Sequence, residues 1–190
     1  MSELAKRRII LMADDDVEDC QLVRDALSEA GRSHDLRTVR DGEELLDYLR
    51  HCGQYVGGHD APRPDLILLD FKMPRKDGRE ALREIKADPR LRLIPVVVLS
   101  TSTIEDDVAF SYDTGANSFI AKPATFRQWV ESVKILCEYW FDIVELPSSD
   151  SSNLCRTKTS LLESEPGRVG LETEPGRVGP ESEPYRIGPK

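Results

Sequence analysis

The segment Leu66-Ile67-Leu68-Leu69-Asp70-Phe71-Lys72-Met73-Pro74 decides the fold of this chain. Its first residues, up to Leu69, are all apolar and lack the polar alternation of a half-exposed strand. Such a continuous run is typical of a strand that is buried on both faces, as in a parallel sheet. Because the run ends in Asp70, the sequence also predicts a carboxylate at the end of a buried strand.

Similar short runs alternate with amphipathic helical patterns over most of the chain. Besides residues 66–69, the strand patterns cover residues 9–13, 36–39, 96–99 and 118–121. The helical patterns cover residues 19–30, 42–50, 78–88, 105–114 and 125–145. This alternation predicts an α/β fold, in which right-handed crossovers place helices on both faces of an open, five-stranded parallel sheet.

Acidic residues gather at one edge of the predicted sheet. Open parallel sheets bind their ligands at the carboxyl ends of the strands. Asp14 and Asp15 follow the first strand there, and Asp70 ends the third. Like charges at close range repel, and a hard divalent cation relieves the repulsion because it prefers carboxylate oxygens. The sequence therefore predicts a Mg2+ site formed by Asp14, Asp15 and Asp70.

A hydroxyl and an ammonium group reach the same edge. Ser100 ends the fourth predicted strand, and Lys122 ends the fifth. Phosphoryl transfer uses this combination: a carboxylate attacks, a metal ion and a lysine neutralise the phosphoryl oxygens, and a hydroxyl donates a hydrogen bond. Asp14-Asp15 and Lys122-Pro123 are weak signals alone, whereas residues 68–74 with Asp77-Gly78 are distinctive. Their joint occurrence at strand ends argues against a purely structural role.

These motifs resemble the receiver domain of two-component response regulators over residues 7–147. The matching motifs, in chain order, are Asp14-Asp15, residues 64–70 with Met73-Pro74 and Asp77-Gly78, Ser100, and Lys122-Pro123. The resemblance implies a doubly wound, flavodoxin-like sheet with strand order 2-1-3-4-5. It also implies a signalling protein that takes a phosphoryl group from a histidine kinase and assists its own phosphotransfer and dephosphorylation, rather than an enzyme with a separate substrate.

The resemblance further implies a role for each residue of the site. Asp70 would be the phosphorylated residue. Asp15, Asp70 and the backbone carbonyl of Lys72 would bind Mg2+ directly, whereas Asp14 would act largely through water bound to the metal. Lys122 would contact the phosphoryl group.

A switch is also implied by the resemblance. Ser100 would move toward the phosphoryl group, and the aromatic side chain of Phe119 would turn inward behind it. The family commonly has threonine and tyrosine at these two positions. Serine keeps the hydroxyl, but phenylalanine lacks one, so a signal that needs a tyrosine hydrogen bond would be absent. The alternative is that Phe119 is an ordinary buried strand residue.

A narrower resemblance concerns the small single-domain regulators that partner bacterial phytochromes. It is carried by Tyr139-Trp140-Phe141 and residues 144–147, together with residues 61–65 and 78–88. This resemblance implies a light-regulated histidine kinase as phosphodonor, and it also favours a dimer.

The last predicted helix carries more apolar residues than one buried face needs. At 3.6 residues per turn, one stripe would face the sheet. The members of this stripe are Phe126, Trp129, Val130, Val133, Cys137, Trp140 and Val144. We expect Ile135, Leu136, Tyr139 and Ile143 to lie outside it and to form an exposed patch. The patch predicts a symmetric homodimer, unless the tail or a loop covers it.

Residues 148–190 differ in composition from residues 1–147, which we expect to form the receiver domain. Ser, Glu, Pro, Gly and Arg dominate, and a nine-residue unit recurs at 162–170, 171–179 and 180–188. So few apolar residues predict a disordered tail, with a docking tail that uses the repeated Arg-Val-Gly as the alternative.

Charge and hydropathy exclude some classes of partner. The net charge of -9 argues against broad contact with nucleic acid, because phosphates require clustered Lys and Arg. The apolar run at residues 9–13 is too short for a secretory signal or a membrane span. We therefore expect a cytoplasmic protein without a membrane partner.

Two other functions compete with the phosphoacceptor. Asp14-Asp15-Asp16 contains the Asp-x-Asp pattern of haloacid-dehalogenase-like phosphohydrolases, in which Asp14 would be the nucleophile. That hypothesis leaves the segment after Asp70 unexplained and provides no cap domain to enclose a substrate. A receiver fold that serves as an unphosphorylated scaffold is the second alternative, and the complete acidic set argues against it.

Overall fold

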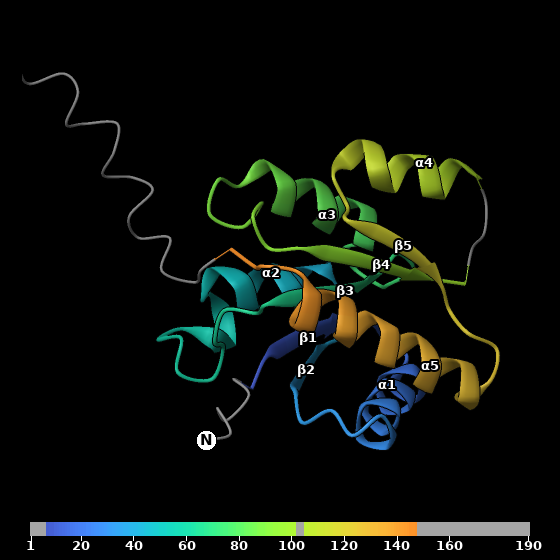
Figure 1. Ribbon diagram of the computed structural model, residues 1–190. Coiled ribbons are helices and arrows are strands. Elements are labelled where there is room, and N and C mark those ends of the chain that lie inside the picture. Colours follow the sequence, from blue (N-terminus) through green and yellow to red (C-terminus); the bar gives the residue numbers. More distant parts are fainter. Residues whose placement is uncertain (1–6, 102–104, 148–190) are drawn as a thin grey trace, which may run out of the picture. The chain divides into compact units, whose positions relative to one another are not determined.

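The computed structural model describes residues 7–101 and 105–147. These residues form a five-stranded parallel sheet in the order β2-β1-β3-β4-β5 (Figure 1). The strands are β1 Ile9–Ala13, β2 Asp35–Val39, β3 Leu66–Asp70, β4 Val96–Ser100 and β5 Ser118–Ala121. The predicted fold class and strand order are confirmed. The predicted tail, residues 148–190, lies outside the described residues.

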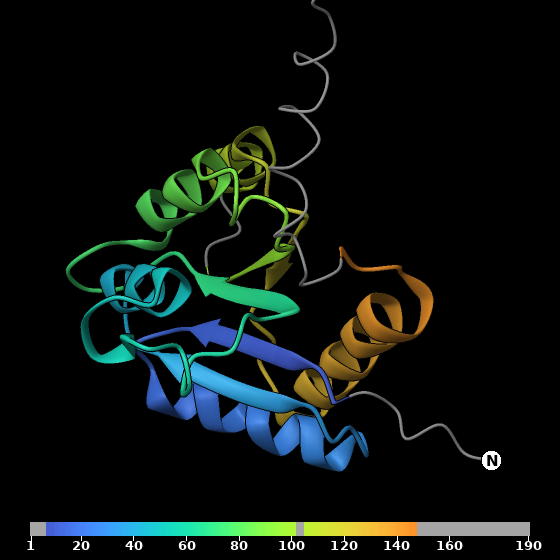
Figure 2. The same cartoon turned by 90° about the vertical axis from the view of Figure 1, so that its left-hand side faces the viewer.

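Helices cover both faces of the sheet, as the crossovers require. The helices are α1 Val17–Glu29, α2 Gly42–Arg50, α3 Gly78–Ala87, α4 Glu105–Thr114 and α5 Phe126–Cys137, with a short 3-10 helix at Gly53–Tyr55 and a π-helix at Glu138–Ile143. Helices α1 and α5 lie on one face, and α2, α3 and α4 lie on the other (Figure 2). Among the described residues, no helix is long and apolar enough to cross a membrane.

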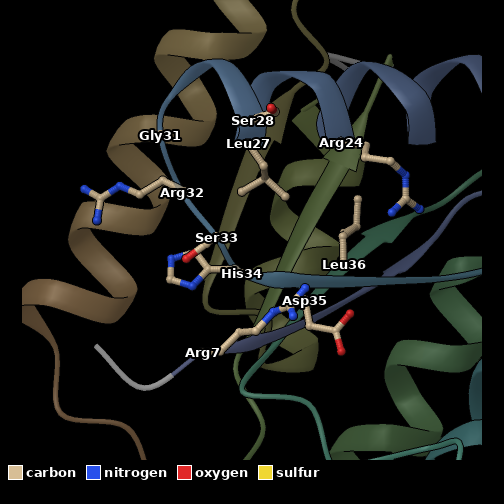
Figure 3. Close-up of a pocket in the computed structure, with 10 residues that line it drawn as sticks. All are labelled: Arg7, Arg24, Leu27, Ser28, Gly31, Arg32, Ser33, His34, Asp35 and Leu36. Carbon is tan, nitrogen blue, oxygen red and sulfur yellow. The ribbon is translucent and has the colours of Figure 1, made fainter. Parts of the chain in front are cut away.

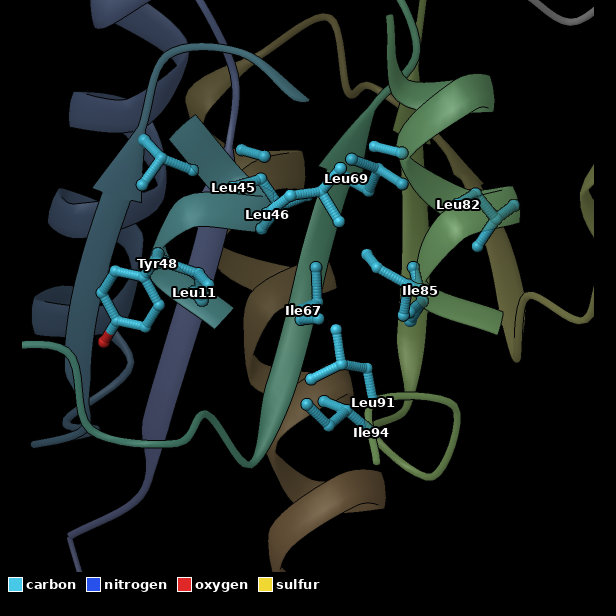
Figure 4. Close-up of a cluster of buried hydrophobic side chains, with 14 of the residues drawn as sticks. Leu11, Leu45, Leu46, Tyr48, Ile67, Leu69, Leu82, Ile85, Leu91 and Ile94 are labelled. Carbon is cyan, nitrogen blue, oxygen red and sulfur yellow. The ribbon is translucent and has the colours of Figure 1, made fainter. Parts of the chain in front are cut away.

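The two core layers explain the continuous apolar runs. Ile67 and Leu69 of β3 pack with Leu11 among the side chains of α2 and α3 (Figure 4). Leu66 and Leu68 point the opposite way, toward α1 and α5. All five residues of β3 are buried. Since each face of the central strand is covered, polar alternation is absent and only the terminal Asp70 carries charge.

Aspartates cap the helices that begin at the carboxyl edge of the sheet, where the site lies. Each helix of a βα unit begins where the preceding strand ends, so its N-cap belongs to the carboxyl edge of the sheet. Asp16 accepts a hydrogen bond from the Glu18 N–H at the start of α1, and Asp77 accepts one from the Glu80 N–H at the start of α3. Such caps stabilise a helix by about 1 kcal/mol each.

The burial of Leu136, near the end of α5, corrects one prediction. We expected Leu136 to be exposed, but it is 7% exposed and packs in the core that α5 forms with the sheet. Leu136 lies two helical turns after Trp129 and three residues after Val133, both of which are buried, so it shares their face. Ile135 and Tyr139 are exposed as expected, with fractions of 59% and 51%.

The regular helical period also ends earlier than predicted. The α-helix stops at Cys137 and continues as the π-helix Glu138–Ile143, whose wider turns shift the side chains around the axis. Ile143 remains exposed, at 68%. Phe126, which was expected to face the sheet, is 45% exposed because it stands at the first position of α5, beyond the edge of the sheet core.

Candidate functional site

The acidic residues that the sequence singled out meet at the carboxyl edge of the sheet. Ala13 of β1 pairs with Leu69 of β3, so the residues that follow these two lie at the same level. Asp14, Asp15 and Asp70 each offer a carboxylate oxygen, and these oxygens lie within 4.8 Å of one another. The predicted convergence of residues from separate strands is therefore present.

The three carboxylates differ in their access to solvent. Asp14 and Asp70 are 2% and 5% exposed, whereas the side chain of Asp15 lies at the surface. Three hard oxygen donors close together suit Mg2+ or Mn2+, which bind carboxylates while keeping several water ligands. This donor set fits a divalent cation.

Lys122 is the cation that the protein itself brings to this cluster. Its Nζ donates hydrogen bonds to Asp14 and to Asp19, at 2.8 Å each, and lies 3.5 Å from Oδ1 of Asp70. Burial lowers the pKa of the Lys122 ammonium, but the hydrogen bonds that it donates to Asp14 and Asp19 raise it more, so its pKa lies above the usual value. Lys122 therefore remains charged.

Asp19 is the site residue that sequence reasoning missed. It lies in the first turn of α1 and shares the Lys122 ammonium with Asp14. A signal was available, because a carboxylate in the first turn of a helix that follows an acidic strand end must lie near that end. Only the structure reveals that Lys122 contacts Asp19 as well as Asp14.

The acidic cluster carries an excess of negative charge. Burial raises the pKa of Asp70 to about 6; the charge of Lys122 opposes this rise, and that of Asp14 adds to it. Burial also raises the pKa of Asp14 above its usual value, although its hydrogen bond from Lys122 opposes the rise. One ammonium does not neutralise these carboxylates, so a further cation would stabilise their ionised forms.

The segment that follows Asp70 is held against it. The Lys72 N–H donates to Oδ2 of Asp70 at 3.1 Å, and the Gly78 N–H donates to the carbonyl of Phe71 at 3.0 Å. A Cβ at position 78 would lie 1.9 Å from the backbone oxygen of Asp70, so only glycine fits there. This close approach explains why glycine follows Asp77 in the motif.

The two predicted switch residues lie on β4 and β5. Ser100 is fully buried at the end of β4, where Leu99 pairs with Asp70. Phe119 is partly buried and packs against the core on the α3 and α4 side, with its ring centroid 6.3 Å from that of Phe71. Ser100 thus lies beside the acidic cluster, whereas Phe119 lies outside it and contacts the residue that follows Asp70.

A hollow lies away from the acidic cluster, near the amino end of β2. It has a volume of about 370 Å3 and is lined by residues that include Arg24, Arg32 and His34 near the start of β2 (Figure 3). His34 packs edge-on against Phe141, with centroids 4.7 Å apart. The residues of this hollow come from α1, from the loop that follows it and from the amino ends of β1 and β2, and none of them belongs to the acidic cluster.

Comparison with known proteins agrees with this geometry. The family model described as response regulator receiver domain matches residues 10–134. The response regulator Rcp1 of Synechocystis sp. is 39% identical over 142 residues, which cover 75% of this chain and 95% of Rcp1.

Two solved structures are similar in fold and sequence. The phosphorylated cyanobacterial phytochrome response regulator RcpA is 47% identical, with a TM-score of 0.70 and coverage of 75% of this chain and 99% of RcpA. The Mn2+-bound form of response regulator Rcp1 is 40% identical, with a TM-score of 0.67 and coverage of 74% and 99%. The residues that the family model matches, 10–134, include the acidic cluster and β2 to β5. The chain therefore belongs to the response regulator receiver domain family, whose members are phosphoacceptor signalling domains, and it is homologous to the phytochrome response regulators Rcp1 and RcpA.

Proposed function

We propose that this receiver domain takes a phosphoryl group from the phosphohistidine of a histidine kinase onto Asp70, and that phosphorylation changes its protein contacts. One observation carries the proposal: Asp70 is buried at the end of β3, within reach of two further carboxylates and of the Lys122 ammonium. A structural core gains nothing from such a cluster, because buried like charges destabilise the fold.

The chemistry follows from the groups present. A carboxylate oxygen of Asp70 attacks the phosphorus, the bond between phosphorus and the imidazole nitrogen of the kinase breaks, and its electron pair returns to that nitrogen. Lys122 can pair with a phosphoryl oxygen, since its Nζ already lies 3.5 Å from Asp70. Ser100 would donate a hydrogen bond to the product. Attack of water on the resulting acyl phosphate releases phosphate and restores Asp70, a reaction that the same residues would assist.

We propose Mg2+ as the resident cation. Asp15, Asp70 and the carbonyl of Lys72 would hold it directly, with Asp14 acting through water. The ion would supply positive charge to the phosphoryl oxygens. The Mn2+-bound form of Rcp1 supports a divalent cation, and Mg2+ suits a site that combines carboxylates with a phosphoryl ligand.

The kinase that we propose as partner is a bacterial phytochrome. Its support is the similarity to RcpA, which is described as a phytochrome response regulator, and the segments of sequence that resemble such regulators. The proposed histidine kinase partner favours a cytoplasmic location. The net charge of -9 gives no support to a nucleic-acid ligand. Output would run through protein contacts.

A homodimer through the end of α5 and the π-helix that follows it is part of the proposal. Ile135, Tyr139 and Ile143 are more than half exposed, and Tyr139 lines an apolar hollow of about 520 Å3 together with Ile120 and Trp140. Exposed apolar surface of this kind usually marks a contact with another protein. A second copy would cover it symmetrically.

The switch would run through Ser100 and Phe119. Movement of the Ser100 hydroxyl toward the phosphoryl group would free space on the α4 side of the sheet. The ring of Phe119 already contacts Phe71, which follows Asp70 in the chain. Because phenylalanine has no hydroxyl, its contribution would be packing alone.

Labelling with acetyl phosphate and Mg2+ tests the function. We expect wild type to form an acyl phosphate and Asp70→Asn to form none, while Asp14→Asn retains slow labelling. Loss of label in Asp14→Asn but not in Asp70→Asn would favour the haloacid-dehalogenase-like hydrolase instead. Absence of label from any donor would favour the scaffold. Phosphotransfer from phytochrome kinases under red and far-red light tests the partner.

A further inference from the structure

The loop between β3 and α3, residues 71–77, is anchored to a third element, the start of α2. The Gly42 N–H donates to the carbonyl of Lys76 at 2.9 Å. The guanidinium of Arg75 forms an ion pair with Asp41, the N-cap of α2. The loop that carries Lys72, the residue we propose as a metal ligand, is therefore attached to α2 at its far end.

Asp41 is suited to join the two elements. It is 1% exposed. Its Oδ1 accepts hydrogen bonds from the N–H groups of Glu43 and Glu44 at 2.9 Å each, and its Oδ2 pairs with Arg75. One buried carboxylate thus caps a helix and neutralises the arginine of the loop. Removal of Arg75 would leave the buried Asp41 carboxylate without its ion-pair partner, which is costly, whereas the Arg75 side chain is itself 59% exposed to water.

The backbones of the two elements also touch. A Cβ at position 42 would lie 2.8 Å from the carbonyl oxygen of Lys76 and 3.1 Å from the Cβ of Ala81. A larger residue at this position would push the loop away from α2. Gly42 therefore allows the approach, and the Asp41–Arg75 pair holds it.

Arg75 adopts a backbone conformation that is rare for residues other than glycine. Its φ is +61°, in the left-handed region. A glycine would satisfy the turn without strain. In this structure the arginine side chain pairs with Asp41, and this ion pair offsets the strain of the positive φ. The side chain of residue 75 thus has a role besides turning the chain.

We propose that Asp41 and Arg75 are positioning residues for the phosphoacceptor site. By holding the far end of the loop against α2, they fix the carbonyl of Lys72 and the N–H that Lys72 donates to Asp70. Both groups belong to the backbone of Lys72, so a displaced loop would move the proposed metal ligand and break the hydrogen bond to Asp70 at the same time. This inference rests on the proposed function, since it assigns these residues to the same metal and phosphoryl site.

Calorimetric titration of the full chain with MgCl2 and labelling with acetyl phosphate test the inference together. Loss of a residue that orients a metal ligand commonly weakens metal binding by about tenfold or more. We expect Arg75→Ala and Asp41→Asn to raise the Kd for Mg2+ by about this factor and to slow labelling, and Arg75→Lys to restore part of both. Arg32→Ala is the matched control, because it breaks an arginine–aspartate pair, Arg32–Asp142, at the other end of the sheet.

Arg75→Gly separates positioning from stability. Glycine suits the positive φ, so this variant should fold at least as well as Arg75→Ala, yet its Mg2+ binding should be equally weak. Wild-type Kd and labelling rate in both Arg75→Gly and Arg75→Ala would overturn the positioning role and leave the proposed function intact. If wild type itself neither binds Mg2+ nor takes label, the proposed function and this inference are both wrong. An equal loss in Arg32→Ala would show a general effect of stability and would also overturn the inference.

Discussion

Lys122 donates a hydrogen bond to Asp14 across 2.8 Å, although 108 positions separate them in the chain. The same Nζ lies 3.5 Å from Asp70, so one ammonium links the ends of β1, β3 and β5. Because 8% of the Lys122 side chain is exposed, water screens this interaction weakly. The stability of the metal-free protein and its chemistry therefore depend on the same residue.

Replacement of Lys122 by methionine should affect both properties. Loss of one partner from a buried ion pair costs about 3 kcal/mol. We expect the free energy of unfolding of Lys122→Met, measured by urea denaturation without metal at pH 7, to fall by this order, and MgCl2 to recover part of the loss. Labelling by acetyl phosphate should slow by about tenfold or more, since charge neutralisation in the transition state is lost. An unchanged labelling rate would contradict the assigned role.

Asp70→Asn should stabilise the metal-free protein. Burial and the charge of Asp14 raise the pKa of Asp70, so its ionised form destabilises the fold at pH 7. Replacement by a neutral side chain of the same shape should raise the free energy of unfolding by an amount on the order of 1–3 kcal/mol. Urea denaturation in EDTA measures it. A decrease in stability would mean that Asp70 does not lie in a cluster of buried carboxylates.

The contribution of Asp70 to the stability of the metal-free protein should fall as the pH rises from about 4 to about 6. Burial raises the pKa of Asp70 from 3.8, the value of an unperturbed aspartate in an unfolded chain, to about 6 in the folded protein. Between these values the folded state binds more protons, so the free energy of unfolding decreases with pH. The difference between wild type and Asp70→Asn isolates this effect from other carboxyl groups. A difference that does not change with pH would contradict the raised pKa.

Binding of Mg2+ should weaken at acidic pH for the same reason. A cation needs the ionised carboxylates, and protons compete for them. We expect the Kd for Mg2+ to rise steadily below about pH 6, where Asp70 becomes protonated. Calorimetric titrations at several pH values measure this change, and EDTA should reverse the stabilisation that Mg2+ provides. A Kd that is independent of pH would place the metal elsewhere.

The exposed end of α5 and its buried neighbour should respond differently to substitution. Ile135→Asp changes an exposed side chain, so it should shift the chain to monomers with an effect on stability of less than about 0.5 kcal/mol. Leu136→Ala removes a buried side chain and should cost about 2–5 kcal/mol. Sedimentation at several concentrations, together with urea denaturation, distinguishes them. A wild-type chain that sediments as a monomer at all concentrations would contradict the dimer.

The strands were predictable because burial on both faces leaves a local mark in the sequence. The runs at residues 9–13 and 96–99 match β1 and β4 to within one residue. The convergence of Asp14 and Asp70 was predictable as well, since the carboxyl ends of parallel strands share one edge. Both inferences depend on neighbours in the chain or on a general rule of topology.

Side-chain partners across loops were not predictable in this way. Asp19 contacts Lys122, and Asp41 pairs with Arg75, through loop paths that no periodic pattern encodes. Leu136 was misassigned because a broad apolar arc does not reveal where the buried face ends. Its position relative to Trp129 would have placed it inside, so this error was one of interpretation and not of missing information.

Identification of the phosphorylated residue tests the central claim most directly. Wild-type protein is treated with acetyl phosphate and MgCl2 and then reduced with borohydride, which converts an aspartyl phosphate to homoserine. Peptide mass spectrometry then locates the converted residue. We predict homoserine at position 70, dependent on Mg2+ and on Lys122. Conversion at Asp14 or Asp15, or at no aspartate although other receiver domains are labelled in parallel, would contradict the account.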